Sequence, residues 1–312
     1  MKLSSSSKLV VMAAKAEISL GRAERAISML MPVLKAEPGN ASAYMVRGLA
    51  LFLRGDFDQA LKHEKEALKL DPDSPNAHKV FQSIRKTLKA QEEAKALFLN
   101  RKFSEAEVQY SEALSALTTL LVPAPLKPPA LQAELLADRA SCFLRMDKFP
   151  EALADAEASL AGLDDCRKAH VVRASALTKM GRPEEAVQLL KEVMKSYGQG
   201  DTELRGALDR ATFEVRKLKR PDYYGVLGVP SVASTIEIKR AYKQRALDCN
   251  PDKYVDQGQE AHKRAEEQFA VLQDALQVLT ENSMSRKLYD EGFDKEAIRE
   301  RLERAQRAAR DY

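Results

Sequence analysis

Two stretches in the last third of the chain place hydrophobic residues on one side of a helix. In the first, Ser234 and Glu237 are spaced as a helix N-cap and its capping-box partner, and apolar residues then recur at helical spacing: Ile238, Tyr242, Ala246 and Cys249. The second carries a similar stripe: Ala265, Phe269, Leu272, Ala275, Leu276 and Leu279. Between them, Asn250-Pro251-Asp252 predicts a short loop, because proline lacks a backbone donor and disfavours helix at the preceding residue. The pattern predicts an antiparallel helical hairpin, with the apolar stretch 223–229 covering its open end.

Earlier in the chain, small residues and turn residues recur at one fixed interval. Pro38 and Pro72 are separated by about 34 residues, as are Ala140 and Ala174, and this is the period of the tetratricopeptide repeat (TPR). Each such repeat is a pair of helices, and successive repeats stack into a solenoid with a concave groove. We expect about five repeats: 7–40, 41–74, 87–120, 133–166 and 167–200.

The remaining segments separate the repeats or close the array. Residues 77–99 contain no glycine or proline, so we expect one long helix that bridges the second and third repeats. The segment 121–129 holds four prolines, a density that forbids a helix and indicates an exposed extended linker. The chain is thereby divided into 1–74 (repeats one and two), 75–86 (bridging helix), 87–200 (repeats three to five), 201–220 (capping helix), 221–290 (hairpin domain) and 291–312 (charged C-terminal helix).

Composition agrees with an all-α protein and argues against several classes of function. The chain of 312 residues has no tryptophan and is rich in good helix formers. Its 50 basic and 46 acidic residues leave a net charge of +4, which creates no general field for nucleic acid. No apolar run reaches the roughly 18 residues of a membrane span, and the apolar stretch 9–14 is too short for a signal-peptide core. We expect a cytoplasmic protein that contacts neither membrane nor nucleic acid.

The residues that usually carry chemistry give no enzyme signature. Four histidines are scattered without metal-ligand spacing and are expected to be exposed polar residues: His63, His78, His170 and His262. Three cysteines include no close pair, which is typical of small side chains in a reducing compartment. There is no glycine-rich phosphate loop and no nucleophile elbow. We therefore expect no enzymatic activity, no cofactor and no metal site.

Short motifs around the predicted hairpin follow one another in a recognisable order: Asp222-Tyr223-Tyr224, Leu227-Gly228-Val229, Arg245-Ala246-Leu247, Pro251-Asp252-Lys253 and Leu288-Tyr289-Asp290. In order and spacing they resemble the J-domain of the Hsp40 family. In that family the hairpin loop reads His-Pro-Asp, and with the basic face of the preceding helix it docks on an Hsp70 and triggers ATP hydrolysis. The resemblance implies a docking surface made of Lys239, Arg240, Lys243, Asn250, Pro251, Asp252 and Lys253.

Asn250 stands where that family has its loop histidine. Imidazole is a flat ring that can be neutral or cationic near neutral pH, whereas the asparagine amide is smaller and always neutral. Asparagine before proline is also a good turn former, so the loop should keep its shape. In addition, Gln244 and Asp248 occupy positions where many J-domains carry basic residues, which weakens the electrostatic match to an acidic Hsp70 surface. We expect the fold of the hairpin to survive while stimulation of an Hsp70 ATPase is weak or absent.

The order of the parts is similar to that of the cytosolic J-proteins that carry TPRs. In chaperone-binding TPR proteins, Lys, Asn, Asn, Lys and Arg at fixed positions clamp the terminal carboxylates of Hsp70 or Hsp90. Only Lys168 matches directly in the third to fifth repeats, whose five positions hold Gln91, Lys95, Asp138, Lys168 and Val172, with Arg173 one residue away. Asp138 would repel an incoming carboxylate, and the first two repeats offer only Val11, Lys15 and Val46. We expect a groove that binds a peptide or a protein without a high-affinity carboxylate clamp.

Two functional hypotheses remain open. The first is a co-chaperone-like adaptor or scaffold, in which the repeats bind a protein or peptide partner and the hairpin is a docking surface only. The second is an active Hsp70 co-chaperone that delivers clients between Hsp70 and Hsp90. Asn250 and the incomplete clamp favour the first, while Pro251, Asp252 and the basic helix face favour contact with Hsp70. The expected partners are proteins: Hsp70, with less support Hsp90, and an unidentified client or assembly.

Overall fold

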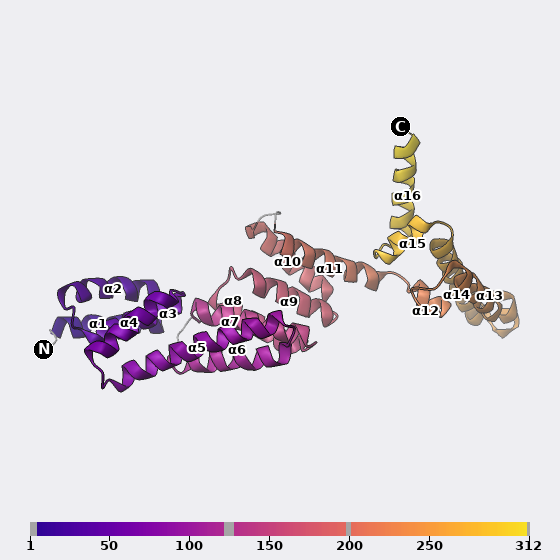
Figure 1. The fold of residues 1–312 in the computed structure, drawn as a ribbon. Helices are drawn as coiled ribbons and strands as arrows, with labels where there is room; N and C mark the ends of the chain where they lie inside the picture. The colour runs from indigo at the N-terminus through magenta and orange to yellow at the C-terminus, as the bar shows by residue number, and fades with distance from the viewer. Residues whose placement is uncertain (1–4, 122–127, 198–200, 311–312) are drawn as a thin grey trace. The chain divides into compact units, whose positions relative to one another are not determined.

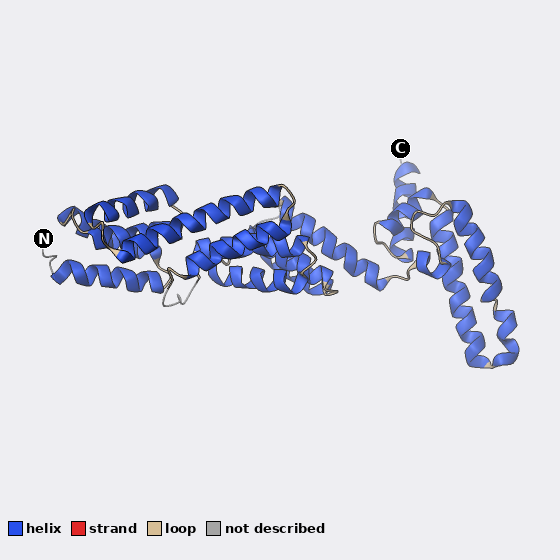
Figure 2. Ribbon diagram, turned by 60° about the horizontal axis from the view of Figure 1, so that its bottom comes forward, coloured by secondary structure: helices blue, strands red, loops and turns tan. Residues whose placement is uncertain are grey.

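The computed structural model describes residues 5–121, 128–197 and 201–310, and every regular element in these ranges is helical (Figure 2). This confirms the all-α prediction. The chain forms two compact units, residues 1–208 and residues 209–312. Most of the proline-rich segment for which a linker was predicted lies outside the described residues.

In the first unit, helices that follow one another in the chain pack against each other as hairpins (Figure 1). The bounds are α1 (Ser5–Ser19), α2 (Ala23–Ala36), α3 (Ala41–Arg54), α4 (Phe57–Leu70), α5 (Pro75–Leu99), α6 (Phe103–Thr118), α7 (Ala130–Arg145), α8 (Phe149–Gly162), α9 (Arg167–Lys179) and α10 (Pro183–Tyr197). Helix α11 (Thr202–Lys219) begins in this unit. The first helices of neighbouring hairpins also pack on one another, α1 on α3, α3 on α5 and α7 on α9, which is the stacking expected of a solenoid.

Helix α5 is the predicted long bridging helix, and it forms one unbroken element from Pro75 to Leu99. It packs on α3 and α4 and also on α6, so it belongs to two successive hairpins at once. Ile84, midway along it, is fully buried in the same apolar core as Leu30 of α2 and Leu135 of α7. Because apolar burial is the main favourable term in folding, this shared core joins the early and middle repeats into one unit.

The repeats turn between their two helices in the same way. One residue at each turn adopts a left-handed backbone, with φ of 75° at Gly21, 102° at Gly55, 62° at Arg101, 58° at Asp147 and 79° at Gly181. These residues recur at the period of the repeats, with a longer interval on either side of the third repeat. Glycine reaches this conformation at little cost, whereas Arg101 and Asp147 adopt it against a steric preference.

The second unit is built around the predicted hairpin of α13 (Thr235–Asp248) and α14 (Gln259–Thr280). The Ser234 hydroxyl accepts from the Glu237 amide at 3.3 Å, and the Glu237 carboxylate accepts from the Ser234 amide at 2.7 Å, so the predicted capping box is present. The connection between the helices is more regular than the loop predicted from Pro251, because residues 251–257 form a short 3-10 helix, η1 (Pro251–Gln257).

Three shorter elements complete this unit: α12 (Tyr223–Leu227), α15 (Ser283–Asp290) and α16 (Lys295–Arg310). Helix α12 packs against α13 and α14 and buries Tyr223 and Leu227, as expected for the apolar stretch at the open end of the hairpin. Tyr223 stacks on Tyr289 of α15 with ring centroids 4.8 Å apart. Helix α16 packs on α15 and buries Ile298, while its other faces are charged. These contacts leave the far end of the hairpin, at Asn250, as its exposed tip.

Candidate functional site

The side chain of Asn250 is used inside the tip of the hairpin. Its amide oxygen accepts a hydrogen bond from the backbone N–H of Asp252 at 3.1 Å, which makes Asn250 the cap of the 3-10 helix. An asparagine before proline favours this local turn, because its short side chain reaches the backbone two residues on. The residue that replaces histidine therefore stabilises the tip.

Lys253 also folds back onto the hairpin. Its ammonium group donates to the carbonyl oxygen of Leu247 at 2.7 Å, and the hydroxyl of Tyr254 donates to the carbonyl of Asp248 at 3.3 Å. Both carbonyls lie in the last turn of α13, where they have no partner within the helix and where a positive charge is favourable. Lys253, predicted as part of the docking surface, thus caps its own helix.

A histidine from the second helix lies against the tip. The ring of His262 places Nδ1 at 3.1 Å from the carbonyl oxygen of Pro251 and Nε2 at 3.4 Å from the carboxylate of Glu266. The prediction that this histidine is an exposed polar residue was wrong, since it is half-buried and contacts the loop. No local sequence signal indicates this contact, because only the pairing of α13 with α14 brings residues 251 and 262 together.

The basic face of α13 is exposed as predicted. Lys239, Arg240 and Lys243 lie on the surface, and none of them forms an ion pair within the described part of the chain. Asp252 is also exposed at the tip. The helix also exposes two apolar side chains, Ile236 with 80% and Leu247 with 66% of its surface exposed. Cations flanked by apolar groups on one exposed helix suit contact with another protein.

The polar residues predicted for the groove of the third to fifth repeats do not form an open carboxylate clamp. Gln91 and Asp138 are buried, and Asp138 forms an ion pair with Lys168. Arg173 lies 3.5 Å from Glu157, and Lys95 is exposed on α5. Burial, together with the nearby carboxylate of Asp138, raises the pKa of Tyr110. Lys168, the one residue that matched the clamp pattern, is therefore neutralised by its neighbour.

Two other kinds of feature, a metal site and a membrane-spanning helix, are absent from the described residues. No group of three or more His, Cys, Asp or Glu side chains in residues 5–121, 128–197 and 201–310 is arranged to hold a metal ion. None of the helices described is both long and apolar enough to cross a membrane.

Comparison with known families agrees with this geometry. The DnaJ domain matches residues 222–290, and the tetratricopeptide repeat matches residues 11–75 and 137–201. The chain belongs to the J-domain proteins that carry TPRs. The resemblance noted in the sequence is thereby confirmed, and the hairpin with its exposed tip is the J-domain.

Two curated proteins are similar to most of this chain. The DnaJ homolog subfamily C member 7 homolog of Schizosaccharomyces pombe is 33% identical over 88% of this chain and 54% of its own length. DnaJ homolog subfamily C member 7 of Homo sapiens is 29% identical over 88% of this chain and 53% of its own length. The chain thus spans about half the length of the curated relatives it matches.

A solved structure supports the fold of the repeats. The crystal structure of the P58(IPK) TPR domain superimposes with a TM-score of 0.54 at 21% identity, covering 69% of this chain and 57% of that one. At this identity the likeness concerns the fold alone.

Proposed function

We propose that this chain is a co-chaperone-like adaptor whose repeats bind a protein or peptide partner and whose J-domain docks on an Hsp70 with little stimulation of ATP hydrolysis. The observation that carries the proposal is Asn250, whose side chain is bound to the Asp252 amide within the tip. The amide is neutral and its oxygen already has a partner, so it cannot supply the partly apolar, protonatable ring of the family's loop histidine.

Most of the residues expected to contact Hsp70 remain exposed. Lys239, Arg240 and Lys243 remain exposed on one helix, and Asp252 remains exposed at the tip. Charges of this kind increase the rate and specificity of association more than they increase affinity. We therefore propose that binding to Hsp70 is retained while activation of its ATPase is weakened.

A single-turnover Hsp70 ATPase assay tests the proposal. The unmodified chain should accelerate hydrolysis little or not at all, and Asn250→His should produce a clear acceleration. Asn282→His is the matched control, because Asn282 caps α15 in the same unit through a bond to the Met284 amide at 2.8 Å. That variant should leave the rate unchanged.

The same assay examines the alternative, an active co-chaperone that passes clients between Hsp70 and Hsp90. The exposed basic face and Asp252 are the observations that favour it. Strong stimulation by the unmodified chain would establish the alternative and reject the adaptor with a weakened J-domain. Equal and low rates for the unmodified chain and for Asn250→His would show that the loop residue is not the cause.

A further inference from the structure

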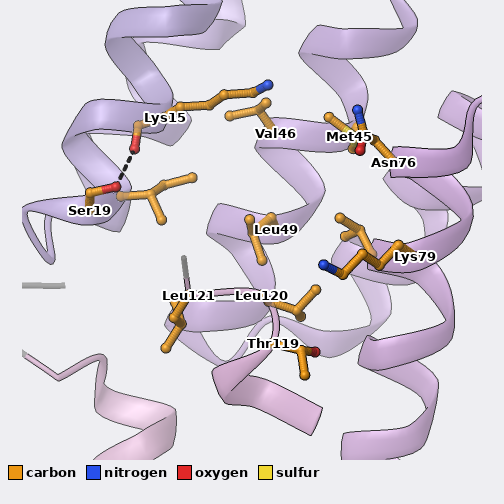
Figure 3. A pocket seen from close by; sticks show the side chains of 12 residues that line it. Lys15, Ser19, Met45, Val46, Leu49, Asn76, Lys79, Thr119, Leu120 and Leu121 are labelled. Carbon is orange, nitrogen blue, oxygen red and sulfur yellow. Dashed lines mark hydrogen bonds between the residues drawn. The ribbon is translucent and has the colours of Figure 1, made fainter. Parts of the chain in front are cut away.

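A pocket opens in the first unit between α1, α3, α5 and the end of α6 (Figure 3). Its volume is about 270 Å³, which is below the range of whole cofactor or drug sites but enough for a large side chain and the backbone beside it. All of its walls lie in residues 15–121, and they come from the first two repeats, the bridging helix and the end of the third repeat.

The floor of this pocket is apolar. Ile18 of α1 and Val46 of α3 are almost fully buried, and Leu49 and Val80 are partly exposed toward the opening. Leu120 and Leu121, just after α6, close the lower side in Figure 3. A surface of this kind gains free energy when an apolar side chain displaces water from it.

The charged side chains around this apolar floor are positive. Lys15 and Lys79 reach in from opposite walls with their amino groups directed inward, as Figure 3 shows. Both lysines are exposed, and neither forms an ion pair within the described residues. None of the described residues that line the pocket is an aspartate or a glutamate, and their other polar groups are the neutral side chains of Ser19, Asn76 and Thr119.

We propose that this pocket binds an internal segment of a partner protein in which an apolar side chain is flanked by acidic residues. This inference rests on the proposed function, in which the repeats hold a protein partner. The apolar side chain enters the floor, and the carboxylates on its two sides pair with Lys15 and Lys79.

The arrangement does not call for a free C-terminus. A terminal carboxylate needs several donors gathered at one point, whereas the two ammonium groups here lie on separate walls with Val46 in the floor. Two separated cations and an apolar floor select a pattern of side chains along a segment, wherever that segment lies in its protein.

Fluorescence anisotropy with the full chain tests this inference. The probe is a labelled peptide with both termini blocked, of sequence Gly-Ser-Asp-Glu-Leu-Asp-Glu-Ser-Gly. It should bind saturably, and replacing its leucine by serine, or its four acids by their amides, should weaken binding by roughly tenfold or more. Added salt should also weaken it, because exposed charges are screened.

Variants of the protein locate the site. Lys15→Glu and Lys79→Glu should each weaken binding by roughly five- to tenfold. Lys65→Glu is the matched control, because Lys65 is an exposed lysine of α4 outside the pocket, and it should leave the affinity unchanged. Since all three side chains are exposed, circular dichroism of the variants should match that of the unmodified chain.

Three outcomes would overturn the inference. The blocked peptide does not bind, or only its form with a free C-terminal carboxylate binds, or all three lysine variants lose affinity equally, which indicates nonspecific attraction. The Hsp70 assay does not involve this pocket, so the proposed function is judged separately.

Discussion

The second and third repeats bury different residues at the same position of their second helix. At corresponding places of the second helix, the third repeat buries Tyr110 and the second repeat buries Glu64, while the first and fifth repeats bury Leu30 and Leu190. Glu64 is completely inaccessible to solvent, and neither carboxylate oxygen has a hydrogen-bond partner among the residues that the structure describes. One repeat thus holds an acid where its neighbours hold apolar side chains.

The facing helix adjusts to this difference. Opposite Glu64 the second repeat has Gly48, where the third has Ala94. A Cβ atom at Gly48 would lie 2.4 Å from Oε1 of Glu64, so the absence of a side chain provides the room for the carboxyl group. Burial raises the pKa of Glu64 to about 9, because desolvation penalises the charged form. The comparison teaches that this repeat geometry accepts a carboxyl group in its core, and that it holds the group in its neutral form.

The largest expected change in stability comes from placing the buried residue of the second repeat, glutamate, at the corresponding position of the third. Tyr110→Glu removes a buried aromatic ring, places a carboxyl group opposite Ala94 and sets it beside Asp138. We expect a loss of about 5 kcal/mol in the free energy of unfolding of the first unit. Urea denaturation followed by circular dichroism measures it, and Tyr110→Leu, which restores the residue type of the first and fifth repeats, should cost far less. Equal losses would show that the carboxyl group adds nothing.

The next largest effect is a dependence of the free energy of unfolding on pH, which arises from Glu64. Its pKa rises from roughly 4.3 in the unfolded chain to about 9 in the folded one. Between these values the folded chain holds a proton that the unfolded chain releases, so the free energy of unfolding is highest below about pH 4 and falls as pH rises toward 9. The free energy of unfolding should therefore fall by about 4 kcal/mol between pH 5 and pH 8 in the unmodified chain.

Glu64→Gln should remove most of this pH dependence, because the amide carries no titrating proton. Glu66→Gln, a change at a partly exposed position of the same helix, should leave it intact. Urea midpoints measured from pH 5 to pH 8 compare the three proteins. A flat profile for the unmodified chain would contradict burial of a neutral Glu64.

The smallest effect concerns the turns. The second repeat turns at Gly55 with φ of 102°, whereas the third turns at Arg101 with φ of 62°. Arg101→Gly should stabilise the first unit by about 1 kcal/mol, because glycine adopts the left-handed conformation without the steric cost. Arg101→Ala removes the same side chain but keeps the unfavourable backbone, so it should show no such gain. Thermal unfolding of both variants separates the two causes.

The candidate sites were predictable to different degrees. The substitution at Asn250 and the exposure of Lys239, Arg240 and Lys243 followed from local sequence, because a helix that buries Ile238 must expose its opposite face. The ion pair of Asp138 with Lys168 did not follow, since it joins the first helices of two successive repeats. The role of His262 at the tip was missed for a similar reason, because it depends on how two helices pair.

By itself the sequence determined the helices, the period of the repeats, the capping box at Ser234 and the identity of the loop residue, because each depends on neighbours within a few turns of the chain. Only the tertiary structure decided which charged side chains form contacts within the protein. Lys253 donates to a carbonyl of its own hairpin, Asp138 pairs with Lys168, and Glu64 is buried beside Gly48. Lys15 and Lys79, in contrast, remain exposed around the apolar floor of the pocket. The physical reason is that the free energy of a charge depends on solvent exposure and on partners brought from distant positions, and neither is set by local sequence.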